Sequence, residues 1–357
     1  MALLVVPPIA TADEWLSGED ATGTWGGRRT ALDEHGLHID LDYVGETFTR
    51  DAKAIAYRAN LDLVLELDTE KAGWWRGGTV LTYAQHDHGD GVSDELGLAM
   101  PVSNFEAEDF TQLSEFWLYQ ELPHGVALRL GKQDANRDFA APRFAGNFIN
   151  SSYGVLPTAP MPSFPAPALG TALFVQPLEW LGVRGGVYDG GPHVESFAGS
   201  AFEDGDGVFV VGAVELTADP DGPRDTSCQL GGWHHSGLDR SGAVAVADLM
   251  LRLSPGADQS KRSLQFFVRG NLDPDAAAPD AEYYLGGGAT AHGFLGMNNT
   301  VGLGGGFVSI DNADQGFLEL FFKWRPLEWF SLQPDLQVYF IEDDTHVLAG
   351  LRFKLKL

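Results

Sequence analysis

A single cysteine, Cys228, occurs among the 357 residues, and this excludes a framework of disulfide bonds. Runs of eighteen apolar residues are also missing, which excludes transmembrane helices, although strands that cross a membrane carry a much weaker signal. Basic residues are scarce, because 23 lysines and arginines stand against 50 aspartates and glutamates, giving a formal net charge of −27. A charge of this sign and size argues against nucleic acid as a partner.

The motifs of common catalytic and metal sites are missing as well. No G-x-S-x-G, P-loop or H-E-x-x-H sequence occurs, so no enzyme activity and no cofactor are predicted. Three weaker metal patterns are better explained otherwise. His86-Asp87-His88 lies at the rim of an acidic loop, His234 and His235 point to opposite faces of a strand, and residues 203–207 lack the full ligand spacing of a calcium loop. No metal site is predicted.

Apolar and polar side chains alternate along much of the chain, most clearly over residues 316–357. Between 346 and 357, for example, Val347, Leu351 and Phe353 share one face of a strand and Arg352 lies on the other. Such strands of about ten residues are typical of the wall of a bilayer-spanning barrel. The sequence predicts an all-β fold, a 16-stranded antiparallel transmembrane β-barrel, with strands at 37–50, 55–68, 77–86, 111–122, 124–133, 168–177, 181–189, 207–218, 227–236, 243–253, 263–272, 281–292, 298–309, 316–326, 329–342 and 346–357.

The connections between these strands sort by length. If both termini are periplasmic, the connections after even-numbered strands are the short periplasmic turns of the barrel. Four of them carry proline, glycine or tryptophan, and Trp74, Trp75, Trp180 and Trp329 are expected to form an aromatic girdle there. The longest connections all follow odd-numbered strands, at 87–110, 134–167 and 190–206. A soluble β-sandwich offers no reason for this sorting.

The region before the barrel divides into two parts. Residues 1–12 have the character of a residual signal peptide, with Ala10-Thr11-Ala12 as a small-residue cleavage site. Residues 13–36 form an N-terminal segment, in which 24–36 predicts a short helix that ends at Gly36. Residues 37–357 are then the barrel domain.

Motifs spread from Thr22 to the C-terminus resemble those of one known family. The sequence runs TGTWGGRRTALDEHGL (22–37), LSEFWLYQEL (113–122), LRLGKQDANRDFA (128–140), GNFINSSYG (146–154), GVYDGGP (186–192), LGGWHHSG (230–237), ADLMLRL (247–253), LQPDLQVYF (332–340) and LAGLRFKLKL (348–357). In order and spacing, these motifs resemble the carbohydrate-selective outer-membrane porins of the OprB type. The resemblance implies a barrel in the outer membrane of a Gram-negative cell, through which monosaccharides and similar small solutes diffuse passively. It also implies contact with outer-membrane lipid and lipopolysaccharide, and a monomer or homotrimer as the assembly.

The connection 134–167 is the expected constriction loop. More than thirty residues without a strand pattern inside a compact fold are usually functional. Prolines between Pro157 and Pro167 stiffen its second half, as a loop that narrows a pore requires. The alternative is an external loop packed over the rim of the barrel.

Strand parity gives the side chains that face this loop across the lumen. Carboxylates, amides and guanidinium groups suit sugar hydroxyls, and aromatic rings suit the C–H faces of pyranoses. The arginines of the loop and wall are expected near Glu115 at the narrowest point, where they offset the acidic lining. The predicted pore-lining residues are Arg129, Glu115, Trp117, Asp134, Arg137, Arg143, Arg184, Arg269, Glu319, Asp335, Gln337 and Arg352.

Two other interpretations of the sequence stay open. The acidic balance favours a general, cation-preferring diffusion porin as the alternative to a sugar channel. An exported soluble all-β protein, glycan-binding or built around a carboxylate pair, is the second alternative. Many of the polar side chains predicted to line the lumen also have a structural explanation, because pairs of them can hold strands together across a water-filled interior.

Overall fold

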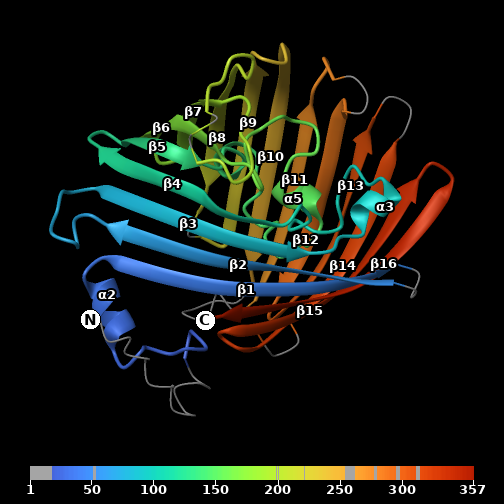
Figure 1. The fold of residues 1–357 in the computed structure, drawn as a ribbon, viewed down its shortest axis with the longest axis horizontal. Helices are drawn as coiled ribbons and strands as arrows, with labels where there is room; N and C mark the ends of the chain where they lie inside the picture. The colour runs from blue at the N-terminus through green and yellow to red at the C-terminus, as the bar shows by residue number, and fades with distance from the viewer. Residues whose placement is uncertain are drawn as a thin grey trace.

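A computed structural model describes residues 18–50, 54–197, 199, 201–220, 222–253, 262–276, 280–294, 298–310 and 314–357. Within these residues, sixteen antiparallel strands pair in sequence order, and β1 (Leu37–Arg50) closes the ring by pairing with β16 (Asp344–Lys356). Figure 1 shows the strands as one curved wall that runs from β1 round to β16. The expected barrel is therefore confirmed. The expected signal segment, 1–12, lies outside the described residues.

The strand bounds agree with those expected from the alternation to within three residues at each end. The largest differences fall at the end of β3 and at the starts of β9 and β10, each of which extends three residues beyond the expected bound. The remaining strands are β2 (Ala54–Asp68), β3 (Gly78–Gly89), β4 (Phe110–Leu122), β5 (Val126–Gln133), β6 (Ala168–Leu178), β7 (Leu181–Asp189), β8 (Val208–Ala218), β9 (Arg224–His235), β10 (Arg240–Arg252), β11 (Ser263–Leu272), β12 (Tyr283–His292), β13 (Asn299–Ser309), β14 (Gln315–Leu327) and β15 (Phe330–Ile341).

The alternation separates an apolar outer face from a polar inner one. On β15, Leu336 and Phe340 are exposed on the outside, whereas Asp335, Gln337 and Tyr339 are buried on the inside. Among the described residues, no helix is long and apolar enough to cross a membrane.

Two of the short turns repeat the sequence Pro-Leu-Glu-Trp, at 177–180 and 326–329. In both, the strand register shifts beside the proline, which has no N–H to give to the sheet. We call the barrel end that carries these turns the turn end, and the opposite end the loop end. Trp74, Trp75 and Trp180 are exposed at the turn end, but Trp329 is buried and does not join the expected girdle.

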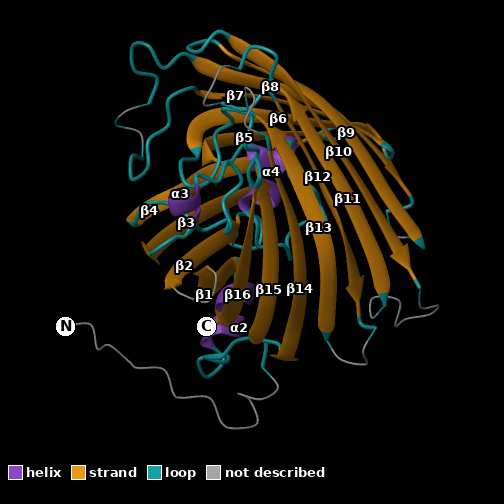
Figure 2. Cartoon of the chain, turned by 90° about the vertical axis from the view of Figure 1, so that its right-hand side faces the viewer, coloured by secondary structure: helices purple, strands orange, loops and turns teal. Residues whose placement is uncertain are grey.

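Two connections from the loop end fold into the barrel (Figure 2). One is 90–109, with α3 (Ser93–Leu96), and the other is 134–167, with α4 (Asn136–Phe139) and α5 (Ser151–Gly154). They also bind each other, since the Asn104 amide donates to the Ile149 carbonyl at 2.9 Å and the Ser151 amide to the Pro101 carbonyl at 3.0 Å. Apolar side chains within 90–109, such as Met100 and Val102, are fully buried, so this connection packs inside the barrel.

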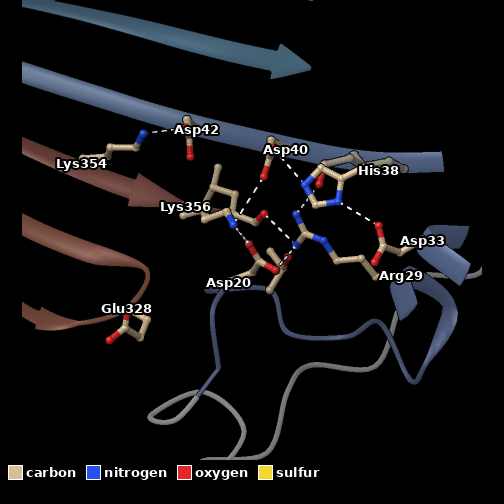
Figure 3. Close-up of polar contacts among 12 residues, drawn as sticks. Asp20, Arg29, Asp33, His38, Asp40, Asp42, Glu328, Lys354 and Lys356 are labelled. Atoms are coloured by element: carbon tan, nitrogen blue, oxygen red, sulfur yellow. Dashed lines mark hydrogen bonds and ion pairs between the residues drawn. The ribbon is translucent and has the colours of Figure 1, made fainter. Parts of the chain in front are cut away.

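At the turn end, the N-terminal segment joins the first strand to the last (Figure 3). Its helix, α2, spans Arg28–Glu34, shorter than the 24–36 expected, because residues 24–27 form a turn and Gly27 takes a left-handed conformation with φ of 86°. The Arg29 guanidinium donates to the carbonyls of Leu357 at 3.1 Å and Ile39 at 2.6 Å, and lies 2.9 Å from Asp20. Lys356 lies 3.4 Å from Asp20, so these contacts form a clasp across the seam between β1 and β16.

Candidate functional site

The wall formed by β11, β14 and β15 holds the 134–167 connection by its backbone. Glu319 of β14 accepts hydrogen bonds from the amides of Ile149 at 2.7 Å and Asn150 at 3.1 Å. Arg269 of β11, which is 1% exposed, donates to three carbonyls of the connection: those of Ala140, Ser152 and Val155. These two predicted lumen residues therefore act as anchors of the loop.

Neighbouring side chains on β15 and β16 hold the 90–109 connection. Gln337 donates to the Val102 carbonyl at 2.9 Å and to the Asp335 carboxylate at 3.1 Å. Arg352 donates to Glu46 of β1 at 2.8 Å and to Asn104 at 2.7 Å. Gln337 and Arg352 thus bind the inserted chain from inside the lumen, whereas Asp335 contacts Gln337 of its own strand.

Apolar packing on two glycine-rich strands completes this attachment. Phe148 and Tyr153 of the connection pack against each other, with ring centroids 4.7 Å apart, and both contact Phe267 of β11. They lie against β12 and β13, where a Cβ on Gly304 would stand 2.4 Å from the Tyr153 hydroxyl and one on Gly288 would stand 2.7 Å from the Phe148 ring. Glycine at these positions lets the rings approach the wall closely.

The opposite wall, from β4 to β9, carries a row of four arginine–carboxylate pairs. We call this row the arginine arc. Two arginines and one carboxylate come from the inserted connection, and the other members project from the strands. The pairs are Arg137–Glu115, Arg129–Asp138, Arg184–Glu215 and Arg143–Asp225.

One end of the arc is built around Glu115 of β4, whose side chain is almost fully buried. Glu115 binds the Arg137 guanidinium, accepts a hydrogen bond from the Trp117 indole at 3.1 Å, and accepts another from the Asp134 amide at 3.3 Å. Burial, with a smaller contribution from Glu115, raises the pKa of Asp134 to about 6. Nearly half of the Arg137 side chain stays exposed, so its remaining donors reach the lumen.

The middle of the arc joins the loop to β5 and β7. Arg129 binds Asp138, and its guanidinium lies over the rings of Trp117 at 5.3 Å and Phe174 at 5.4 Å. Arg184 donates to the Asp138 carbonyl at 2.7 Å while it binds Glu215 of β8. Each guanidinium is fixed by several partners, which keeps the arc in one geometry.

Arg143 is the predicted residue that the structure places apart from Arg129 and Glu115. Its guanidinium donates two hydrogen bonds to the Asp225 carboxylate of β9, at 2.8 and 2.7 Å, in a bidentate pair. The sequence predicts both Arg137 and Arg143 near Arg129 and Glu115; in the structure Arg137 binds Glu115, whereas Arg143 binds Asp225. Sequence parity places Asp225 on the inner face of β9, but nothing in the sequence links it to Arg143.

Several functional partners were missed by the sequence analysis. Asp138, Glu215 and Asp225 complete the arc, and the runs of glycine at 286–288 and 304–306 receive the loop rings. The glycine runs carried a usable signal, because glycine inside a strand marks a close approach of another chain segment.

The metal patterns of the sequence do not gather into a site in the part of the chain described here, where no group of three or more His, Cys, Asp or Glu side chains is arranged to hold an ion. His86 and His88 lie on β3, which continues to Gly89, rather than in a loop. Their rings stack at 4.9 Å, and His86 bonds to the Thr111 hydroxyl at 2.7 Å.

Comparisons with known proteins agree with this architecture. A family model described as carbohydrate-selective porin, OprB family, matches residues 52–239. The fold is similar to that of OprB from Pseudomonas putida, with a TM-score of 0.83 to its high-pH structure at 17% identity, over 96% of this chain and 99% of that one. Its low-pH structure gives 0.70 at the same identity and coverage. OpdK from Pseudomonas aeruginosa, solved with vanillate, gives 0.53 at 12% identity, over 90% and 98% of the two chains. No curated protein matches the sequence.

Proposed function

Because this chain belongs to the OprB family of carbohydrate-selective porins, we propose that the arginine arc is the part of its pore that selects neutral monosaccharides. The family forms channels in the outer membrane through which sugars diffuse, so this chain is a channel and not a soluble all-β protein. The observation that carries the proposal is the arc itself.

Charge balance supports a preference for neutral solutes. The arc sets four guanidinium groups against four carboxylates, in a chain whose formal charge is −27. Paired charges at close range leave little net field for an ion to follow, while their free lone pairs and N–H groups still bind hydroxyls. Guanidinium forks and carboxylates offer paired hydrogen bonds of the kind that neighbouring sugar hydroxyls accept and donate.

The inserted connection supports a narrow passage beside the arc. Residues 134–167 are fixed to β11 and β14 through Arg269 and Glu319, and they present Arg137, Asp138 and Arg143 to the facing wall. Because the backbone of the loop is fixed to the wall, the width of the passage beside it stays constant. We therefore propose that this segment is the constriction of the pore, with β4 to β9 as the facing wall.

The test uses Arg137→Gln, with Arg76→Gln in an exposed turn as the matched control. Loss of the Arg137 charge unbalances the arc toward its carboxylates, so the reversal potential in a salt gradient shifts toward stronger cation preference. Glucose block of the current weakens by roughly tenfold, because a charged hydrogen-bond donor is removed. Arg76→Gln changes neither property. Unchanged glucose block in Arg137→Gln would reject the arc as the selective element.

A general cation-preferring channel is the competing function, and the acidic balance of the whole chain favours it. The two functions differ in the wild-type protein. A sugar channel shows saturable block of ion current by glucose and a modest reversal potential. A general channel shows a strong cation preference and no saturation.

We also propose that the apolar outer face, which includes Leu230, Leu285 and Leu303, contacts outer-membrane lipid and lipopolysaccharide. The assembly in the membrane is a monomer or a homotrimer. Native mass spectrometry from detergent distinguishes them by mass, and co-purified lipopolysaccharide is detected in the same spectra.

A further inference from the structure

A cavity of about 660 Å³ opens at the turn end, on the far side of α4 from the loop end. Its lumen-side lining comes from four consecutive strands and from the inserted connection: Tyr119, Glu121, Arg129, Phe174, Arg184 and Asp138. At the turn end, the cavity is bounded by Gly125, which lies in a turn, and by Gln176, which lies near the next turn. The volume is in the range of about 300–1,000 Å³ that is usual for small-molecule sites.

Two aromatic rings form one side of this cavity. Tyr119 and Phe174 lie next to each other, with ring centroids 6.1 Å apart and planes tilted by 56°. Both are only partly buried, although they lie on the inner face of the wall beside charged groups. Aromatic rings that face a wet lumen offer apolar surface to a solute, and covering that surface has a small desolvation cost.

Charged groups surround these rings in equal numbers of each sign. Arg129 and Arg184 supply two positive charges, and Asp138 and Glu121 supply two negative ones. Arg129 and Asp138 are paired to each other, and a quarter of the Arg184 side chain is exposed. Glu121 is exposed near the opening of the cavity. An apolar platform with donors and acceptors at its edges suits a ring that has C–H groups on its face and hydroxyls around its rim.

We propose that this cavity is a second sugar subsite, beyond the constriction, that binds one neutral pyranose. The apolar face of the sugar lies on Phe174 and Tyr119, and its hydroxyls meet Arg184 and Glu121. The inference rests on the proposed sugar-channel function and adds to it the residues that receive a sugar on its way to the turn end. The cavity adjoins the arc through Arg129 and Asp138, so a sugar passes from one set of partners to the next.

The experiment measures glucose block of single-channel current in the wild type and in Phe174→Leu. Leucine keeps an apolar side chain and removes the ring, so the dissociation constant of glucose rises roughly two- to tenfold. Conductance and reversal potential without sugar are recorded in the same variants, because the Phe174 ring also supports Arg129 of the arc. The matched control is Phe340→Leu, the same change on a ring that faces outward on β15, and its glucose affinity equals that of the wild type.

Tyr119→Leu separates stacking from the support that Phe174 gives to Arg129, because the rings under that guanidinium are Trp117 and Phe174. It is expected to weaken glucose binding in the same direction as Phe174→Leu. Phe174→Tyr keeps the ring and retains wild-type affinity. All variants are first shown to be folded by heat-modifiable migration on gels. Wild-type affinity in folded Phe174→Leu, or equal weakening in Phe340→Leu, overturns the subsite. Glucose uptake by liposomes carrying the wild type tests the channel function separately, since failure there rejects the sugar porin and not merely this cavity.

Discussion

Asp134 connects the arc to pH at the scale of one residue. It follows directly after β5 and lies beside Glu115 and Arg137, and burial raises its pKa to about 6, with Glu115 adding to the shift. Above pH 6 the carboxylate is ionised and attracts cations, and below pH 6 it is neutral. Cation preference therefore falls as the pH drops from about 7 to 5. Reversal potentials measured across this range show a step in the wild type and a flatter profile in Asp134→Asn; identical profiles in the two proteins would remove Asp134 as the titrating group.

The outer face of the wall does not tolerate a charged side chain, whereas the inner face does. Leu303 on β13 is 57% exposed on the outside, whereas Gln265 on β11 lies inside and bonds to Thr290 and His292. Leu303→Arg is expected to destabilise the barrel by about 2–4 kcal/mol, because it places a charge in the bilayer. Gln265→Arg keeps the wild-type unfolding midpoint in urea and changes conductance. Equal midpoints for the two variants would contradict the assigned faces.

At the scale of elements, the strands were predictable because each follows a local period of two. The spacing of Val347, Leu351 and Phe353 alone places the faces of β16, and pairing with neighbours does not alter them. The inserted connections were only half predictable. The length of 134–167 and its prolines indicated a functional loop, but the anchors Arg269 and Glu319 lie more than a hundred residues away in sequence. Contacts of that kind depend on the closed ring, which no local pattern encodes.

The glycines of β12 and β13 provide a test of how the inserted connection is seated. Gly304→Ala places a methyl group 2.4 Å from the Tyr153 hydroxyl and 2.8 Å from the Phe148 ring, so the loop must move. We expect a loss of about 1–3 kcal/mol in stability, as for overpacked cores, together with higher conductance. Gly316→Ala on β14 is the control, because the added methyl group lies 3.7 Å from its nearest neighbour. Single-channel recordings that show equal conductance in both variants would mean that the rings do not hold the loop.

At the scale of the whole molecule, the barrel closes where its first and last strands meet, and the N-terminal clasp lies across that seam (Figure 3). Arg29→Ala leaves the carbonyls of Ile39 and Leu357 without this donor, and we expect a loss of about 1–3 kcal/mol of stability. The side chain is 12% exposed in its pair with Asp20, so added salt screens the contact weakly and the loss persists at high ionic strength. Arg28→Ala, one residue earlier on the exposed face of α2, is the control. Urea unfolding in detergent, followed by heat-modifiable migration, gives a lower midpoint for Arg29→Ala alone; a shift shared by both variants would place the effect in the helix, and no shift would mean that the ring closes without the clasp.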